Sequence, residues 1–355
     1  MGQAEKAALA DVIDSGYIND GQVTRQFEAE IAKIAGTAYC VAVTSGTTAI
    51  TLALMGMRVG PGDEVLVPDL TFIATANAVR LTGASVRLVD VEPKNFTIDV
   101  ERVAAAIGPR TRAIVPVDVN GRGCDYAALE MLCRDHGLVM VTDSCEALGS
   151  RHMGKPLGSF GAAGCFSFSP NKTITTGQGG AITTDDAALV DRLRELKDQG
   201  RRVQGTGGDD LHPVLGYNFK LTNIQAAIGL AQLEHFQKRI KKAKRQNGWY
   251  FDRLHAAKGI DASRLKDGKD GTALQWSDIL CDDRSALVRA FEADGIGNRP
   301  FWLPLHRQEP YKADDADFPI TIEISAKGLW LPSHFDLTEE QTDRVVSVIS
   351  EHHVQ

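Results

Sequence analysis

Lys172 is the residue of this chain whose surroundings most suggest chemistry. It lies within residues 166–180, a stretch of hydroxyl side chains and glycines that follows an apolar run. From residue 160 to residue 184 it is the single ionised side chain. A lysine in such surroundings can be desolvated enough to lose its proton and attack a carbonyl carbon. A lysine in a loop is usually a surface charge, and the lack of neighbouring charges favours the reactive interpretation.

Two further signals come from segments that follow apolar runs. Residues 43–49 end such a run with a Ser-Gly-Thr sequence and then begin a helical pattern. Backbone N–H groups at a helix N-terminus bind phosphate, although Ser and Thr are also ordinary helix caps. Asp143 ends the apolar run 139–142. Parallel strands place ligands at their carboxyl ends, so this acid either pairs with the ring nitrogen of a cofactor or caps a helix.

Taken together, these signals are more specific than any one of them. The chain offers a phosphate cradle, an aspartate at a strand end and a lysine further along. Pyridoxal-phosphate (PLP) catalysis needs an anchor for the phosphate, a partner for the ring nitrogen and an amine that joins the cofactor covalently. The conjunction therefore predicts a PLP enzyme with Lys172 as the cofactor lysine.

The elements that must position these residues follow an alternating pattern. Short, continuously apolar runs alternate with helix-like segments up to about residue 185, as expected for parallel strands covered on both faces. The expected strands are residues 39–43, 64–67, 85–89, 113–117, 138–142 and 164–168. The expected helices are residues 48–57, 71–81, 126–136, 187–198, 224–255, 285–294 and 338–350, the last capped near Thr338.

The pattern predicts an α/β protein with two domains. Residues 1–245 would form a large PLP-binding domain with a mostly parallel sheet, and residues 246–355 a smaller C-terminal α+β domain. The single long helix expected at 224–255 would link the two.

Composition excludes several other classes of protein. The formal net charge is −7, whereas nucleic-acid binding favours a basic surface. The six cysteines are widely spaced without a CxxC pair, which argues against a metal site and favours a reducing cytoplasm. The first ten residues lack the apolar core of a signal peptide. No apolar run approaches the roughly 20 residues that cross a bilayer, so we expect no membrane partner.

The motifs resemble those of the DegT/DnrJ/EryC1/StrS family, the PLP-dependent aminotransferases of nucleotide-linked sugars. This family has the fold-type-I architecture, a three-layer large domain followed by a small domain. The similarity runs over nearly the whole chain and covers residues 15–21, 27–28, 45–49, 68–75, 143, 172, 216–227, 304–306 and 331–332.

The resemblance implies roles for individual residues. Lys172 would carry the cofactor as a Schiff base and then move protons, and Asp143 would pair with the pyridine nitrogen. Glu146 would contact the ring hydroxyl, and Phe72 would stack on the ring face. The implied phosphate ligands are Gly46, Thr47 and Ser167, with Asn218 from the partner subunit of a homodimer. Trp302 and His306 would face the substrate, with Tyr311 as a further candidate or simply a packed aromatic.

Two residues depart from the family pattern. Gln178 stands where the family has an acid, so any role there that needs a charge is in doubt. Lys220 replaces an arginine and loses the bidentate fork that recognises phosphate or carboxylate.

Residues 299–304 and 330–333 most resemble the GDP-perosamine synthase branch of the family. That branch uses glutamate to aminate GDP-4-keto-6-deoxymannose and releases 2-oxoglutarate. An octulosonate or a UDP- or dTDP-linked keto-sugar is the alternative substrate. A sugar dehydratase of the same family would have histidine at position 172. A PLP-binding regulatory protein without turnover is a less favoured alternative, since it would not need the Asp143–Lys172 pair.

Overall fold

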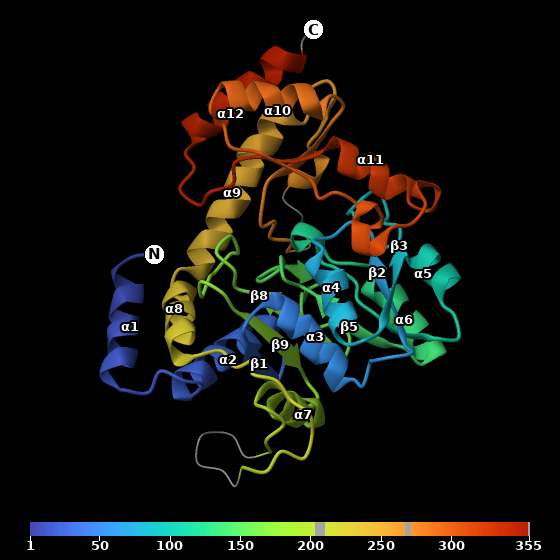
Figure 1. Ribbon diagram of the computed structural model, residues 1–355. Coiled ribbons are helices and arrows are strands. Elements are labelled where there is room, and N and C mark those ends of the chain that lie inside the picture. The colour runs from blue at the N-terminus through green and yellow to red at the C-terminus, as the bar shows by residue number, and fades with distance from the viewer. Residues whose placement is uncertain (203–209, 267–270, 354–355) are drawn as a thin grey trace.

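The computed structural model describes residues 1–202, 210–266 and 271–353 of the chain. Its centre is a seven-stranded sheet in the order β1-β9-β8-β5-β4-β2-β3 (Figure 1). The pairs β2–β3, β2–β4, β4–β5 and β5–β8 are parallel, whereas β9 runs antiparallel to β1 and β8. The prediction of a mostly parallel α/β sheet is confirmed. The strands are β1 (Tyr39–Val43), β2 (Glu64–Pro68), β3 (Ser85–Val89), β4 (Thr111–Ile114), β5 (Val139–Asp143), β8 (Ala163–Ser167) and β9 (Gly180–Thr184).

Helices bury both faces of this sheet. On one face, Val41 and Val43 of β1 share an apolar cluster with α3 (Gly46–Gly56), α4 (Ala74–Leu81) and α7 (Ala187–Lys197). On the other face, Cys40 and Ala42 of the same strand pack with α2 (Gln22–Ala35). Covered strands have no solvent-facing side to keep polar, and this is why the runs in the sequence are apolar throughout.

The helices at Gln3–Asp14, Gln22–Ala35 and Val100–Ala106 were not predicted, and two further features of the large domain also differ from the expectation. Strand β9 was not predicted, because its five residues follow the glycine-rich lysine segment without a helical pattern between. The single helix expected at 224–255 is wrong: α8 (Asn223–Leu233) and α9 (Phe236–Leu254) are separate, and His235 between them has φ −101° and ψ 0°. The break lets α8 lie along α1 (Gln3–Asp14) while α9 runs out to the small domain (Figure 1).

The C-terminal part has its own sheet and core. Strands β10 (Ile260–Asp261), β11 (Asp278–Cys281), β13 (Gly328–Trp330) and β12 (Arg299–Pro300) pair antiparallel in that order. Helices α10 (Arg284–Ala293) and α12 (Glu339–His353) cover the sheet with the end of α9. The predicted boundary at residue 245 falls inside α9.

The remaining helices are α5 (Val100–Ala106), α6 (Tyr126–His136) and α11 (Pro319–Lys327). Short 3-10 turns lie at Val119–Gly121, Ser263–Leu265, Leu305–Arg307, Glu309–Tyr311 and Asp315–Asp317. A two-strand ribbon consists of β6 (Arg151–His152) and β7 (Lys155–Pro156).

A buried ion pair joins the two parts of the chain. The Arg122 guanidinium donates to both carboxylate oxygens of Asp278, at 3.1 and 2.7 Å, and its Nε donates to the Asn95 carbonyl. The two side chains are 6% and 0% exposed. Loss of one partner would leave the other charge buried and uncompensated. The pair therefore holds the start of the C-terminal sheet against the large domain.

Candidate functional site

The site is assembled where three strands of the large sheet end. Gly46 follows β1, Asp143 closes β5 and Lys172 follows β8. Gly180, the first residue of β9, lies so close to the β1–α3 turn that a Cβ there would be 2.2 Å from the Ser45 carbonyl oxygen. A side chain at position 180 would push the lysine loop away from the turn. Glycine at this position therefore allows the three segments to meet.

The N-terminus of α3 has the features of an anion site. Ser45 caps the helix by accepting from the Thr48 N–H at 3.1 Å. The N–H groups of Gly46 and Thr47 have no acceptor within the described residues. A Cβ on Gly46 would lie 2.8 Å from the Ser167 Cβ, so the Ser167 side chain borders the same helix end. Free N–H donors, the helix dipole and a hydroxyl together suit a phosphate group.

Asp143 is held by two donors and is 6% exposed. Its Oδ2 accepts from the Thr75 hydroxyl at 2.7 Å, and its Oδ1 accepts from the Cys145 N–H at 3.1 Å. These bonds fix the plane of the carboxylate and leave acceptor capacity on both oxygens. The carboxylate can therefore pair with a protonated ring nitrogen. Sequence reasoning missed Thr75, because a hydroxyl on an expected helix carries no signal of its own.

A second buried carboxyl lies behind Asp143. Asp118 accepts from the Ser144 hydroxyl at 2.6 Å and from the Tyr126 hydroxyl, and its N–H donates to the Asp143 carbonyl. Burial raises the pKa of Asp118 to about 7, and the nearby Asp143 charge adds to the rise. Two carboxyl groups in such unequal surroundings can have different protonation states. Because Asp118 is neutral in mild acid, it adds no negative charge next to Asp143 at that pH.

Lys172 lies between an acid and an aromatic ring. Its Nζ is 3.6 Å from Glu146 Oε1 and 5.1 Å from the centre of the Trp276 ring, and its side chain is 12% exposed. Burial raises the pKa of Glu146, and the Lys172 charge opposes the rise. The other carboxylate oxygen of Glu146 accepts from the Asn120 N–H at 2.9 Å. Asn120 and Trp276 are the neighbours that sequence reasoning did not identify.

A cavity of about 690 Å³ opens beside Lys172. One wall comes from the lysine loop and the other from the C-terminal part of the chain, including Trp276 and Trp302. Arg239 and Arg299 add positive charge to the lining. A cavity of this volume is large enough for a small organic ligand. Trp302, predicted to face the substrate, lies in this wall.

The other predicted site residues have varied positions. Phe72 lies two residues before the start of α4 and is 51% exposed, and Asn218 is exposed on the surface of the chain. His306 does not reach the cavity: its ring is 0% exposed, and its nitrogens contact Asp69 at 2.6 Å and Asp315 at 2.9 Å. These contacts correct the prediction that His306 faces the substrate. Both of its ring nitrogens already have an aspartate as partner.

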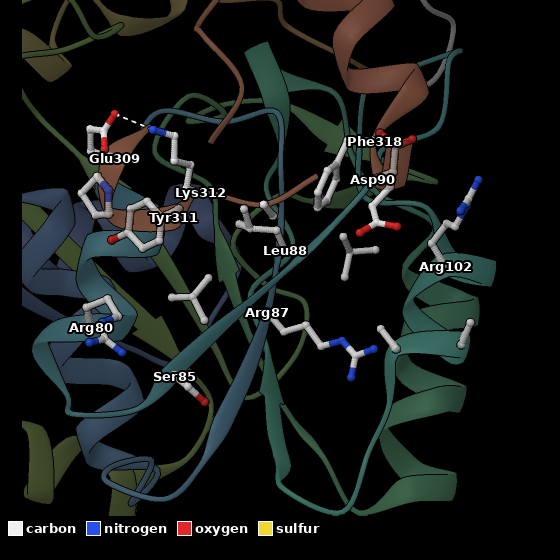
Figure 2. A pocket seen from close by; sticks show the side chains of 17 residues that line it. Arg80, Ser85, Arg87, Leu88, Asp90, Arg102, Glu309, Tyr311, Lys312 and Phe318 are labelled. Carbon is white, nitrogen blue, oxygen red and sulfur yellow. Dashed lines mark hydrogen bonds and ion pairs between the residues drawn. The ribbon is translucent and has the colours of Figure 1, made fainter. Parts of the chain in front are cut away.

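A second cavity, of about 770 Å³, lies along edge strand β3 and contains Tyr311 (Figure 2). The Tyr311 hydroxyl donates to Asn77 Oδ1 at 2.6 Å. Arg80, Arg87 and Lys312 also line this cavity, whereas the residues predicted to hold the cofactor do not. Tyr311 is therefore a packed residue of a separate hollow.

The two departures from the family pattern are also located. Lys220 pairs with Asp198, next to the isolated bridge between Asp198 and Asn218. Gln178 is exposed, and its carbonyl accepts from the Gln225 amide at 2.8 Å. Within the described residues, no cluster of side chains could hold a metal ion.

Comparisons with known proteins agree with this geometry. The model of the DegT/DnrJ/EryC1/StrS aminotransferase family matches residues 1–350. The chain is 38% identical to the GDP-perosamine synthase of Caulobacter vibrioides, over 98% of this chain and 95% of that protein. It is 36% identical to a UDP-N-acetyl-3-dehydro-alpha-D-glucosamine 3-aminotransferase of Acidithiobacillus ferrooxidans, over 96% and 91% of the two chains.

The solved structure of DesV from S. venezuelae superposes with a TM-score of 0.93 at 32% identity, covering 99% of this chain and 94% of that one. The fold, the site and these likenesses define a PLP-dependent aminotransferase of nucleotide-linked sugars. Within that class, the chain belongs to the DegT/DnrJ/EryC1/StrS aminotransferase family.

Asp118 should make stability depend on pH. Its folded-state pKa of about 7 lies above the ordinary value of 3.8, so the folded protein retains a proton that the unfolded chain loses. The free energy of unfolding should therefore fall as the pH rises from about 4 to 7. Asp118→Asn should remove on the order of 3 kcal/mol of this fall, measured by urea denaturation at pH 4.5 and pH 8. The exposed Asp11→Asn serves as the matched control. An unchanged slope in Asp118→Asn would mean that Asp118 is ionised throughout.

Proposed function

We propose that this aminotransferase moves an amino group from glutamate to the ketone of GDP-4-keto-6-deoxymannose, which would give GDP-perosamine. The observation that carries the proposal is the placement of Arg299, Trp302 and Trp330. These residues belong to the two segments that most resemble GDP-perosamine synthases, and all three line the Lys172 cavity. Three relatives at 33–38% identity bear that name.

The proposed roles of the site residues follow from their contacts. Bound PLP supplies an electron sink and a temporary carrier for the amino group. Lys172 would hold the cofactor and would move a proton during the reaction. Asp143, fixed by Thr75, would keep the ring nitrogen protonated. Glu146 would bind the ring hydroxyl and Phe72 would pack on the ring, while Gly46, Thr47 and Ser167 would bind the phosphate.

Two arginines in the cavity suit the acids that the reaction must accommodate. Glutamate and 2-oxoglutarate each carry two carboxylates, and a nucleotide sugar carries a diphosphate. Arg299 lies exposed at the cavity, and within the described residues no carboxylate pairs with it. Arg239 reaches the cavity while it donates to the Thr173 carbonyl at 3.0 Å. Guanidinium groups bind carboxylates and phosphates as planar, charged donors.

A substrate screen tests the proposed function. The pyridoxamine-phosphate form of the enzyme is offered GDP-, UDP- and dTDP-linked keto-sugars and an octulosonate, and its consumption is followed by absorbance. We expect GDP-4-keto-6-deoxymannose to react at least about tenfold faster than the others, a ratio of roughly 1.4 kcal/mol in the barrier. A UDP- or dTDP-linked sugar that reacts fastest would overturn the nucleotide assignment. Cofactor binding without turnover of any substrate would favour the regulatory alternative.

Lys172 should be the residue that borohydride labels. Treatment of the PLP-loaded enzyme should leave a stable pyridoxyl group on the peptide that contains Lys172, as read by mass spectrometry. Lys172→Ala should still bind PLP through the phosphate site but lose turnover, because it lacks the amine that moves the proton. Lys33→Ala is the control, since that lysine is exposed on α2 and lies outside the cavity. Label on another lysine would contradict the assignment.

The exposed face around Asn218 supports a homodimer with shared sites. Leu211 and Leu215 in the same segment are 63% and 79% exposed, and a partner surface would bury such apolar side chains. Asn218 itself is exposed, and in the family pattern this position completes the phosphate site of the neighbouring subunit. We therefore propose that each active site is finished by Asn218 of the partner.

Mixed dimers test the shared site. Lys172→Ala and Asn218→Asp subunits should each be inactive alone, because each lesion disables every site in its own homodimer. In a heterodimer with shared sites, one site regains both native residues while the other carries both lesions. Activity should return to about half the wild-type rate per heterodimer, because the twofold symmetry gives each dimer two equivalent sites. If the mixture stays inactive, each subunit supplies its own complete site.

A further inference from the structure

His306 is fully buried and does not line the Lys172 cavity, whereas Trp302, a few residues earlier, does. The backbone N–H of His306 donates to Asp69 Oδ1 at 2.7 Å, and its ring Nδ1 lies 2.6 Å from Asp69 Oδ2. The N–H of Leu305 donates to the Asp69 carbonyl at 3.0 Å. These contacts span 237 residues of the chain and join the segment that supplies Trp302 to the end of β2.

Asp69 depends on His306 for the compensation of its charge. Its side chain is 0% exposed, and within the described residues both donors to its carboxylate belong to His306. Burial raises the pKa of Asp69, and the hydrogen bonds from His306 oppose the rise. A buried carboxylate that loses a donor keeps the cost of desolvation without the compensating bond. Loss of the Nδ1 contact therefore favours a rearrangement of the backbone around Asp69.

The residues that follow Asp69 reach the proposed cofactor site. Residues 69–75 leave β2 and enter α4, and they include Phe72 and Thr75. Thr75 donates through its hydroxyl to Asp143 Oδ2 at 2.7 Å and through its N–H to the Phe72 carbonyl at 3.2 Å. The segment is thus a short, internally bonded link between Asp69 and two groups proposed to contact the cofactor ring.

The second ring nitrogen of His306 faces outward. Nε2 lies 2.9 Å from Asp315 Oδ1, and the Asp315 side chain is 55% exposed and is also bound by Arg307 at 2.6 Å. The imidazole ring stacks on Phe318, with the ring centres 4.5 Å apart. His306 therefore has an inner contact with Asp69 and an outer contact with Asp315, and substitutions can remove the two separately.

We infer that His306, although it does not reach the cavity, is a positioning residue of the cofactor site. Its Nδ1 contact with Asp69 fixes the segment that carries Phe72 and Thr75. Once that contact is lost, Phe72 is no longer held against the ring, and Thr75 no longer orients the carboxylate of Asp143. The inference rests on the proposed roles of Phe72 and Asp143 and is independent of which keto-sugar reacts.

Two amide substitutions separate the contacts of His306. The amide nitrogen of asparagine is as many bonds from Cβ as Nδ1 and can donate to Asp69, whereas that of glutamine matches Nε2 and can donate to Asp315. Both variants lose the ring and its stacking on Phe318. We expect His306→Gln to weaken PLP binding by about 10- to 100-fold, through poorer ring stacking and a misaligned Asp143, and His306→Asn to stay within about threefold of wild type.

The test measures how tightly and in what orientation each apoenzyme binds PLP. Equilibrium dialysis gives the affinity, and the visible circular dichroism of saturated protein reports the orientation, because achiral PLP gives this signal only when a chiral site holds it. His306→Gln should lose a large part of the signal per bound PLP, and His306→Asn should retain it. A merely structural role would lower the melting temperature of both apoenzymes and leave the signal per bound PLP unchanged.

Asp315→Ala is the matched control, because it removes the outer contact and leaves the inner one. It should bind PLP within about threefold of wild type. If His306→Gln does not fold, His306→Phe replaces it, since it keeps a ring against Phe318 and lacks both nitrogens.

Wild-type affinity and signal in the variant that lacks the inner contact would overturn the inference, while labelling of Lys172 and the substrate screen would still stand. Equal losses in His306→Gln and His306→Asn, or in Asp315→Ala, would overturn it as well, because the inner contact would then have no special role. A wild-type protein that binds no PLP would overturn both the inference and the proposed roles of the site residues.

Discussion

Asn120 connects the active lysine to the C-terminal part of the chain. It adopts a left-handed backbone conformation, with φ 53° and ψ 32°, which asparagine tolerates better than most residues. In this conformation its N–H holds Glu146, the acid beside Lys172, while its side chain holds the backbone of Trp276 from both sides. Gly121, the next residue, allows the close approach, because a Cβ there would be 2.5 Å from the Ala273 carbonyl oxygen. This turn therefore holds both the acid beside Lys172 and the backbone of Trp276 in the cavity wall.

The carboxyl groups of the site differ in burial and in the hydrogen-bond donors that surround them. Asp143 receives a hydroxyl and an N–H and lies at a strand end, whereas Asp118 is fully buried and has a raised pKa. One acid is thus suited to hold a charge against a ring nitrogen, and the other to remain neutral in mild acid. Glu146 is also buried, and its carboxylate forms an ion pair with Lys172 at 3.6 Å.

Sequence reasoning reached the fold and the centre of the site because both depend on local patterns. Covered strands are apolar along their whole length, and Gly46, Asp143 and Lys172 each follow such a strand. Thr75, Asn120 and Trp276 escaped because their importance comes from contacts with residues far away in the chain: Asn120 and Trp276 are 156 residues apart. The prediction for His306 failed because the sequence around a histidine gives no sign that two aspartates already hold its ring. The break at His235 is likewise set by packing, since both flanking segments have helical patterns.

The placement of the tryptophans also gives this protein an optical property. Trp276, Trp302 and Trp330 line the cavity beside Lys172, with the Trp276 ring centre 5.1 Å from Lys172 Nζ, whereas Trp249 on α9 lies outside it. PLP absorbs in the range where indole emits, so energy transfer over such short distances quenches these rings strongly. The emission that remains comes mainly from Trp249. Cofactor loading and departure can therefore be followed in the native enzyme, without an attached dye.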